Sequence, residues 1–478
     1  MPGVRVRYSP APTGELHVGN ARTALFNYLY GHHTGGTFLL RIEDTDLVRS
    51  TQVAIEQAKH ALQWLGLEWD GEPVLQSEFA DHHRAAAQQL IEGGSAYECY
   101  CTKEELDARN AEAQAAGRPP GYDGTCRDLD SATRGARRAE GRPVSIRFRT
   151  PDEGESRFID IVRGEVVVPW STIADFVIVR SDGAPVFFLA NAVDDLDMGI
   201  THVIRGADLI DTTHRVLAIR HALGEHGDPM YAHCPLILGP GGHKLSKRHG
   251  AVSIEEYREA GYLPAALVNY LALLGWSPGD DRQVMNEAEL VEAFDIVHIT
   301  HASATFDAQK LEWMNGEHIR AMATADLCAA VAPFARDRYG AMIDGDSDGV
   351  AKLDAAVALA QQRATTLVQI AEQARFLFVP DDRFEIAPQS WEKLAGTERV
   401  GEMLDAVITH VDTCEWTLEA LDLRDLVKGL GLKPAKALPA LYAAIEGAHA
   451  GLPLFDSMFL LGRHRCLTRL RSARERVA

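Results

Sequence analysis

The segment spanning residues 4–42 constrains the fold most, because it changes in turn between strand, loop and helix patterns. Residues 4–8 alternate apolar and charged side chains as a strand does. A loop rich in proline and glycine follows at residues 9–14, where regular structure is excluded. Apolar residues then recur at helical spacing from about Asn20 to Tyr30, and residues 37–42 form an apolar run typical of a buried strand. This order predicts a parallel β-α-β unit, and hence an α/β fold whose site lies at the strand ends.

The pattern changes twice further along the chain. Residues 91–185 hold three of the seven cysteines, a polar stretch and short strand-like runs, which indicate an inserted domain. The α/β pattern resumes near Phe187. From about Ser253 the chain is mostly helical, and Ser253 with Glu256 predicts a capping box at the start of that region.

Composition limits the class of protein. A chain of 478 residues predicts about three domains, and 46% apolar with 24% charged residues is a globular balance. No apolar run is long enough to span a membrane, and no signal-peptide pattern is present, so we expect a cytoplasmic protein without a membrane partner. The seven cysteines do not form a disulfide framework, which agrees with a reducing compartment. The net charge of −20 argues against a general nucleic-acid coat, but it permits an enzyme with a local basic face.

The first candidate site is the segment PAPTGELHVGN at residues 10–20. The loop leaves a strand and brings His17 and Gly19 to the N-terminus of a helix, where unpaired N–H groups and the helix dipole favour phosphate. A histidine there can donate a hydrogen bond to phosphate oxygens during phosphoryl or nucleotidyl transfer. The alternative is a simple turn with Asn20 as the helix N-cap.

The second candidate site is the segment GPGGHKLSKR at residues 239–248. A glycine-rich loop that closes over a triphosphate would place Lys244, Lys247 and Arg248 on the leaving pyrophosphate. The alternative is a solvated basic turn. The segment is not a P-loop, because the chain has no Gly-Lys-Ser or Gly-Lys-Thr triplet.

Together, HVGN (17–20) and KLSKR (244–248) resemble the two signatures of class I aminoacyl-tRNA synthetases. The strings at residues 12–27, 41–46, 193–195, 202–206 and 311–316 resemble the bacterial glutamyl-tRNA synthetases, and the similarity runs from about residue 4 to the C-terminus. The resemblance implies a Rossmann-type parallel-sheet catalytic domain with an α+β insertion, followed by an all-helical anticodon-binding region. The implied domains are 1–90 (catalytic, first half), 91–185 (inserted, acceptor-binding), 186–250 (catalytic, second half), 251–320 (stem-contact) and 321–478 (anticodon-binding).

The resemblance also implies a reaction in two steps. ATP activates L-glutamate to glutamyl-adenylate with release of pyrophosphate, and the glutamyl group then passes to the terminal adenosine of tRNA(Glu) with release of AMP. The resemblance assigns His17, Gly19, Lys244 and Lys247 to catalysis, with Mg²⁺ accompanying the ATP, and implies a monomer. The implied ATP site is Pro10, Thr13, Gly14, His17, Gly19, Asn20, Asp208, Leu236, Ile237, Lys244, Leu245, Ser246, Lys247 and Arg248.

A substrate that ends in a carboxylate calls for a guanidinium fork. Arg7 and Arg205 match the arginines that hold glutamate in the family, Asn191 matches a further contact, and Glu43 matches the acceptor of the substrate ammonium group. Two further positions of the implied glutamate site depart from the family. Ala11 stands where the family has serine, and Phe187 stands where it often has tyrosine. Each change removes a hydroxyl, so we expect weaker binding of glutamate rather than a different substrate.

The cysteines of the inserted segment predict a metal site. Cys99 and Cys101, followed by Cys126 and Asp128, have the spacing of a tetrahedral Zn²⁺ site and resemble the zinc knuckle of some family members. Tyr122 is a rival fourth ligand, and three free thiols are the alternative to a metal site.

Recognition of tRNA is expected in the helical C-terminal third. Arg363 matches an arginine that some family members use to recognise the third anticodon base, and the alternative is an ordinary exposed helix arginine. The helical third argues against a short paralogue that attaches glutamate to a modified tRNA base, and with residues 311–316 it argues against a small-molecule adenylyltransferase. The intact residues His17 and Lys244 argue against a non-catalytic relative. Whether tRNA(Gln) is also charged stays open.

Overall fold

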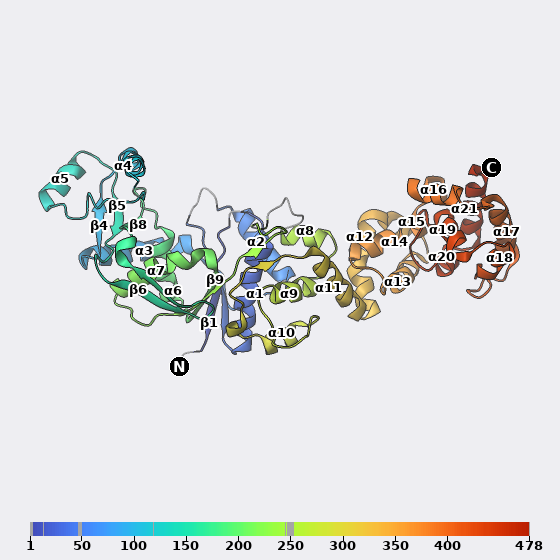
Figure 1. Ribbon diagram of the computed structural model, residues 1–478, viewed down its shortest axis with the longest axis horizontal. Coiled ribbons are helices and arrows are strands. Elements are labelled where there is room, and N and C mark those ends of the chain that lie inside the picture. Colours follow the sequence, from blue (N-terminus) through green and yellow to red (C-terminus); the bar gives the residue numbers. More distant parts are fainter. Residues whose placement is uncertain are drawn as a thin grey trace. The chain divides into compact units, whose positions relative to one another are not determined.

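The structure, a computed structural model, describes residues 3–12, 14–45, 50–117, 119–243, 245 and 253–477. The chain forms two compact units, of which the first comprises Met1–Tyr257 with Leu267–Ala308 and the second Arg258–Ala266 with Gln309–Ala478 (Figure 1). The five boundaries that the sequence implies stay predictions.

The predicted β-α-β unit is confirmed. Strand β1 (Arg5–Tyr8) runs parallel to β2 (Thr37–Ile42), and α1 (Val18–His33) connects them. Helix α1 is longer at both ends than the sequence pattern predicted, because His17 caps its first turn and the chain continues helical to His33. Strand β3 (Val74–Leu75), which follows α2 (Gln52–Trp64), extends this sheet beside β2.

A second sheet has the order β7-β6-β10-β9. Strands β9 (His202–Gly206) and β10 (Met230–Cys234) are parallel, and β6 (Glu155–Asp160) joins β10 in parallel and β7 (Gly164–Pro169) in antiparallel orientation. The hairpin β6–β7 lies in the segment that the sequence assigned to an insertion, yet it pairs with a strand from after that segment. Helices α6 (Phe187–Asp197) and α7 (Ile210–Ala222) pack against each other beside this sheet.

The rest of the inserted segment forms its own antiparallel sheet. Strands β4 (Ala96–Cys99), β5 (Ser145–Phe148) and β8 (Phe176–Val179) are paired in that order. Helix α3 (Ala80–Glu92) leads into this sheet, and α4 (Lys103–Ala115) and α5 (Ser131–Ala139) lie at its end in Figure 1. Strand β4 ends at Cys99, so the sheet places the first cysteine of the predicted metal site.

The predicted capping box at Ser253 is confirmed. The Glu256 N–H donates to Ser253 Oγ at 3.2 Å, and the Ser253 N–H donates to the Glu256 carboxylate at 3.1 Å. Helices α8 (Ile254–Glu259), α9 (Pro264–Leu273) and α10 (Glu287–Ala293) follow. In the same region β11 (Ile237–Leu238) pairs with β12 (Ala304–Thr305), which fixes the backbone just before the basic loop.

The described part of the second unit is helical, as the sequence predicted, and it packs around one apolar core. No helix among the described residues is long and apolar enough to span a membrane. The helices are α11 (Ala308–Ala321, which begins one residue earlier), α12 (Thr324–Gly345), α13 (Gly349–Ala360), α14 (Leu367–Gln373), α15 (Arg375–Phe378), α16 (Pro388–Ala395), α17 (Val400–Thr413), α18 (Arg424–Gly429), α19 (Pro434–Glu446), α20 (Leu454–Leu461) and α21 (Arg463–Arg476).

One carboxyl group is buried in this helical core. Glu446 ends α19, and its Oε1 atom has no hydrogen-bond partner among the residues that the structure describes. Burial raises the pKa of Glu446 to about 8, although the Ser457 hydroxyl and the Leu452 N–H act in the opposite direction. The folded unit therefore keeps this carboxyl protonated at neutral pH, while the unfolded chain releases the proton near its ordinary pKa of about 4.3.

Glu446→Gln is expected to remove a pH-dependent loss of stability. Between the two pKa values the unfolded state binds fewer protons, so the parent's free energy of unfolding falls as pH rises toward 8 and is constant above it. The melting temperature of the second unit should therefore be roughly 3–8 °C higher in the variant than in the parent at pH 8, and nearly the same in both at pH 5. An equal shift at both pH values would contradict this assignment.

Candidate active site

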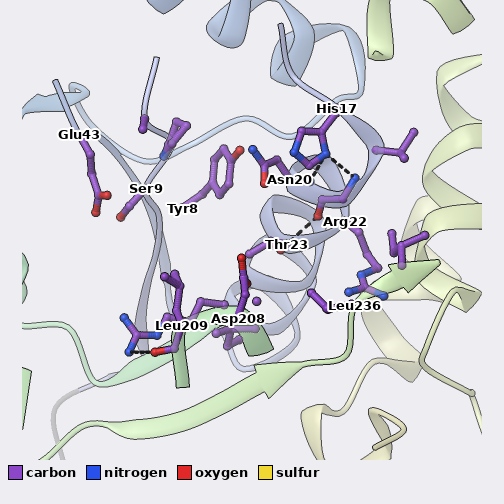
Figure 2. Close-up of a pocket in the computed structure, with 18 of the residues that line it drawn as sticks. Tyr8, Ser9, His17, Asn20, Arg22, Thr23, Glu43, Asp208, Leu209 and Leu236 are labelled. Carbon is purple, nitrogen blue, oxygen red and sulfur yellow. Dashed lines mark hydrogen bonds between the residues drawn. The ribbon is translucent and has the colours of Figure 1, made fainter. Parts of the chain in front are cut away.

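A cavity of about 940 Å³ opens in the first unit, where β1 and β9 end and α1 begins (Figure 2). The structure brings most of the residues predicted for the ATP and glutamate sites to its wall. These are Arg7, Pro10, Ala11, Gly14, His17, Gly19, Asn20, Glu43, Phe187, Asn191, Arg205, Asp208, Leu236, Ile237 and Leu245. The predicted residues Thr13, Lys244, Ser246, Lys247 and Arg248 lie outside the described residues.

His17 is the N-cap of α1, so the interpretation of Asn20 as the N-cap is wrong. Its Nδ1 atom accepts from the Gly19 N–H at 3.1 Å and from the Asn20 N–H at 3.4 Å (Figure 2). A ring nitrogen that accepts carries no proton, so Nε2 carries it and is a donor. A Cβ atom at position 19 would lie 3.0 Å from the ring, which explains the glycine. The sequence predicted that unpaired backbone amides at this helix N-terminus could bind phosphate. In the structure two of these amides, those of Gly19 and Asn20, donate to the His17 side chain.

Asp195 neutralises the cations behind the cavity wall. Arg7 donates to both of its carboxylate oxygens, at 3.0 and 3.1 Å, and Arg41 Nη1 donates to Oδ1 at 2.5 Å. The two guanidinium groups hold the pKa of Asp195 well below its usual range against the effect of burial. Arg7 therefore lines the cavity with much of its hydrogen-bonding capacity already used.

Arg205 differs from Arg7, because no carboxylate of the described residues forms an ion pair with it. Arg205 is the next-to-last residue of β9 and is only 5% exposed. Its Nε and Nη2 atoms donate to His233 Nε2 at 3.0 Å and Thr213 Oγ1 at 2.7 Å. Burial lowers its pKa to about 10, which still leaves it charged at neutral pH. A buried charge without a counter-ion is costly, so this position favours an anionic ligand.

Glu43 adds a carboxyl group to the wall of the same cavity (Figure 2). Its side chain, 13% exposed, accepts from Arg41 Nη2 and from Asn191 Nδ2, each at 3.3 Å. Burial raises the pKa of Glu43, while the charges of Arg41 and Arg7 act against that rise. The cavity thus presents a cation at Arg205 and a carboxyl at Glu43.

Sequence reasoning missed several groups in and behind this wall. The Tyr8 hydroxyl and Ser9 Oγ line the cavity and are buried without a hydrogen-bond partner among the described residues. Burial raises the pKa of Tyr8, so its hydroxyl keeps its proton. Asp195 lies in the segment of residues 193–195 that resembles the family, but the sequence assigned no role to it. The signal that could have found it is charge balance, because arginines on two adjacent buried strands need a carboxylate.

The backbone segment around Leu236 forms the other end of the cavity. Arg22 on α1 is buried and donates to the Pro235 carbonyl and, at 2.9 Å, to the Leu274 carbonyl. Leu236 is 38% exposed and Ile237 is buried, with the latter held in β11. This segment offers an apolar side chain and fixed backbone groups, which suit a purine ring.

The three cysteines of the inserted segment converge. The Sγ atoms of Cys99, Cys101 and Cys126 lie within 4.8 Å of one another. The Tyr122 hydroxyl lies 3.7 Å from Cys99 Sγ. Hydrogen bonding from Cys126 and the Arg147 charge lower the pKa of Cys99 despite burial.

Asp128 does not belong to the cysteine group. Its carboxylate is exposed and pairs with Arg149 at 2.8 Å. The tyrosine alternative for the fourth ligand therefore fits the geometry better than the aspartate. Three thiols and a hydroxyl are a donor set for a soft tetrahedral cation such as Zn²⁺.

Arg363 lies in the turn after α13 and is exposed, so it is not a residue of a regular helix. Its positive charge opposes the rise that burial causes in the pKa of Tyr442. The guanidinium therefore lies near the Tyr442 side chain at the surface of the second unit.

Comparisons with known proteins agree with both units. The family model described as the catalytic domain of class I tRNA synthetases for E and Q matches residues 3–313, and an anticodon binding domain matches residues 326–474. A glutamate–tRNA ligase of Streptomyces avermitilis is 42% identical over 98% of this chain and 95% of its own length. Glutamate–tRNA ligase 1 of Xanthobacter autotrophicus is 43% identical over 98% of this chain and 99% of its own.

The same relationship holds for solved structures. A glutamate–tRNA ligase of Elizabethkingia meningosepticum, solved in complex with its amino acid, covers all of this chain and of its own at a TM-score of 0.85 and 30% identity. The similarity spans both units and leaves no long segment unmatched.

Asp195→Asn is expected to destabilise the first unit, because it leaves Arg7 and Arg41 as buried cations without their shared counter-ion. The free energy of unfolding should fall by about 3 kcal/mol, measured by urea denaturation. Asp128→Asn, which alters an exposed ion pair, is the matched control and should change it by less than about 1 kcal/mol. Equal effects of the two substitutions would contradict the role of Asp195.

Proposed function

The chain belongs to the bacterial glutamate–tRNA ligases of the class I tRNA synthetase family, and we propose that its cavity binds glutamate and ATP side by side. The chain is thus an enzyme that joins glutamate to tRNA, and the proposal concerns which of its residues do this. By the same resemblance, we infer that it works as a monomer in the cytoplasm on tRNA(Glu).

The observation that carries the proposal is the unpaired charge of Arg205 in the same cavity as Glu43. Glutamate has a carboxylate at the end of its side chain and an ammonium group at its other end. We place the side-chain carboxylate on Arg205, whose Nη1 group has no protein partner among the described residues and can donate to it. The ammonium group then lies at Glu43, beside Asn191. Arg7 contributes its positive charge and part of the cavity wall. Its Nε and Nη2 groups already donate to Asp195, so they are not available to the substrate.

In the first step the α-carboxylate of glutamate attacks the α-phosphate of ATP. The new C–O–P bond forms as the bond to pyrophosphate breaks, so no proton has to move, and positioning and charge stabilisation dominate. His17 is oriented with its Nε2 proton as a donor for phosphate oxygens, and Gly19 leaves room for that ring. Leu236 and Ile237 would receive the adenine. Mg²⁺ bound to ATP supplies charge neutralisation of the phosphates, and Lys244 and Lys247 are proposed for the departing pyrophosphate.

In the second step a ribose hydroxyl of the terminal adenosine of tRNA attacks the glutamyl carbonyl. The ester bond forms, AMP leaves, and the hydroxyl proton goes to the departing phosphate. The second unit would read the anticodon, and we propose Arg363 for its third base, because the guanidinium is exposed in a turn where an unstacked base can reach it.

The two hydroxyls lost at Ala11 and Phe187 have neighbours that can take their place. Ser9 Oγ and the Tyr8 hydroxyl line the same cavity, and neither has a hydrogen-bond partner in the described part of the chain. We propose that these groups contact the substrates, since buried polar atoms without partners are uncommon outside binding sites. Weaker glutamate binding, as expected from the sequence, is then partly offset.

The cysteine group is proposed as a structural Zn²⁺ site. Cys99, Cys101 and Cys126 would bind through sulfur, with Tyr122 as the fourth ligand. Bound there, the ion would supply a cross-link between the end of β4 and the loop at residues 122–126. It would take no part in the chemistry at the cavity.

Arg205→Gln is expected to raise the KM for glutamate by about 100-fold, because the substrate carboxylate loses its cation in a buried site. The KM for ATP should stay within about threefold, since adenine and phosphates are placed elsewhere. Steady-state tRNA charging at varied glutamate and ATP measures both values. Arg205→Lys, which keeps the charge but not the fork, should fall between parent and Arg205→Gln. An unchanged KM for glutamate in Arg205→Gln would refute the assignment.

Metal analysis of the purified protein should give about one zinc ion per chain. Cys126→Ser should lose it, and Tyr122→Phe should weaken retention against a chelator, because one donor is removed from four. Asp128→Ala is the matched control and should retain zinc as the parent does. If the purified protein contains no metal and still charges tRNA fully, the proposal is wrong. If Asp128→Ala loses zinc, Asp128 and not Tyr122 is the fourth ligand.

A further inference from the structure

A buried network behind Arg205 fixes how its guanidinium faces the cavity. Residues Arg205 on β9 and His233 on β10 occupy paired positions of two parallel strands, so their side chains lie on the same face of the sheet. Arg205 Nε donates to His233 Nε2 at 3.0 Å. The Tyr231 ring, two residues before His233, stacks parallel to the imidazole and lies below the guanidinium.

Asp160 holds the imidazole in one tautomer. Its Oδ2 atom accepts from His233 Nδ1 at 2.6 Å and from the His233 backbone N–H at 3.0 Å. Its Oδ1 atom accepts the N–H groups of Val162 and Arg163. All of these contacts need an ionised, acceptor-only carboxylate, so the imidazole proton lies on Nδ1 and the Nε2 lone pair faces Arg205.

The guanidinium is therefore held along one edge. His233 Nε2 accepts a hydrogen bond from Arg205 Nε. Thr213 Oγ1, on α7, and the Leu209 carbonyl both accept from Arg205 Nη2. Nη1 is left as the end of the fork without a protein partner among the described residues. None of the holding groups brings a carboxylate into contact with Arg205, so the network orients the cation without neutralising it.

We propose that His233 and Asp160 are positioning residues for substrate recognition: Asp160 fixes the tautomer of His233, and His233 turns Arg205 so that the Nη1 end meets the side-chain carboxylate of glutamate. Neither residue touches the substrate. The inference rests on the proposed role of Arg205. It also explains why the hairpin β6–β7, from the inserted segment, pairs with β10, because that pairing brings Asp160 beside His233.

The test is a set of variants in steady-state tRNA charging. His233→Leu removes the acceptor at similar size, and it should raise the KM for glutamate about tenfold while the KM for ATP and kcat stay within about threefold. His233→Gln, whose side-chain oxygen can accept from Arg205, should recover most of the loss. Asp160→Asn should resemble His233→Leu, because its amide hydrogens oppose the Nδ1 proton and favour the wrong tautomer.

His214→Leu is the matched control. His214 is also buried and contacts the Phe158 ring, but it hydrogen-bonds to Ser156 and does not line the cavity. This variant should lose stability in thermal melting without a change in the KM for glutamate. Inhibition by glutamine, which carries no charge on its side chain, should be equal in parent and His233→Leu, since the network acts through the charge of Arg205.

The outcomes separate the two claims. If Arg205→Gln raises the KM for glutamate but His233→Leu and Asp160→Asn do not, the positioning role is wrong and the proposed function stands. If Arg205→Gln has no effect, both fall. If His233→Leu lowers kcat and raises the KM for ATP as much as the KM for glutamate, the effect is not specific to glutamate recognition, His233 is only a core residue and the inference is overturned.

Discussion

The balance of buried charge at the ends of the parallel strands is the constraint on which the site depends. Arg7, Arg41 and Arg205 are all buried there, and Asp195 compensates the first two. Arg205 has hydrogen-bond partners but forms no ion pair within the described part of the chain. A fold can hold such a cation only if stability gained elsewhere offsets its desolvation. This is the physical basis of our proposal that the side-chain carboxylate of glutamate binds at Arg205.

The end of the cavity that we propose for phosphate depends on a different interaction. His17 caps α1 through Nδ1 and thereby fixes its own tautomer, so the interaction that begins the helix also aims the Nε2 proton. Gly19 permits this because any side chain there would crowd the imidazole ring. One local hydrogen-bonding arrangement thus sets both the start of the helix and the direction of a donor. The same principle, a histidine whose tautomer is set by its other nitrogen, recurs at His233 behind Arg205.

Several elements were predictable because their causes are local. The strand before residue 9, the helix after residue 17 and the capping box at Ser253 follow from periodicity and from short-range hydrogen bonds. The sequence predicted residues 91–185 as one inserted segment, and it did not predict that this segment contributes strands to two different sheets. The hairpin β6–β7 joins β10 by pairing across some 70 residues, and a pairing over that distance leaves no trace in local periodicity.

The sequence by itself determined the fold class from hydrophobic periodicity, and its motifs determined the family and, through the resemblance, more than half of the residues that reach the cavity wall. Only the tertiary structure decided which arginine is free to meet a substrate. Arg7 and Arg205 look alike in sequence, and they differ because α6 brings Asp195 to one while β10 brings neutral His233 to the other. It also decided between Asp128 and Tyr122 beside the thiols. Such choices depend on distances between side chains far apart in the chain, and these exist only once the sheets have formed.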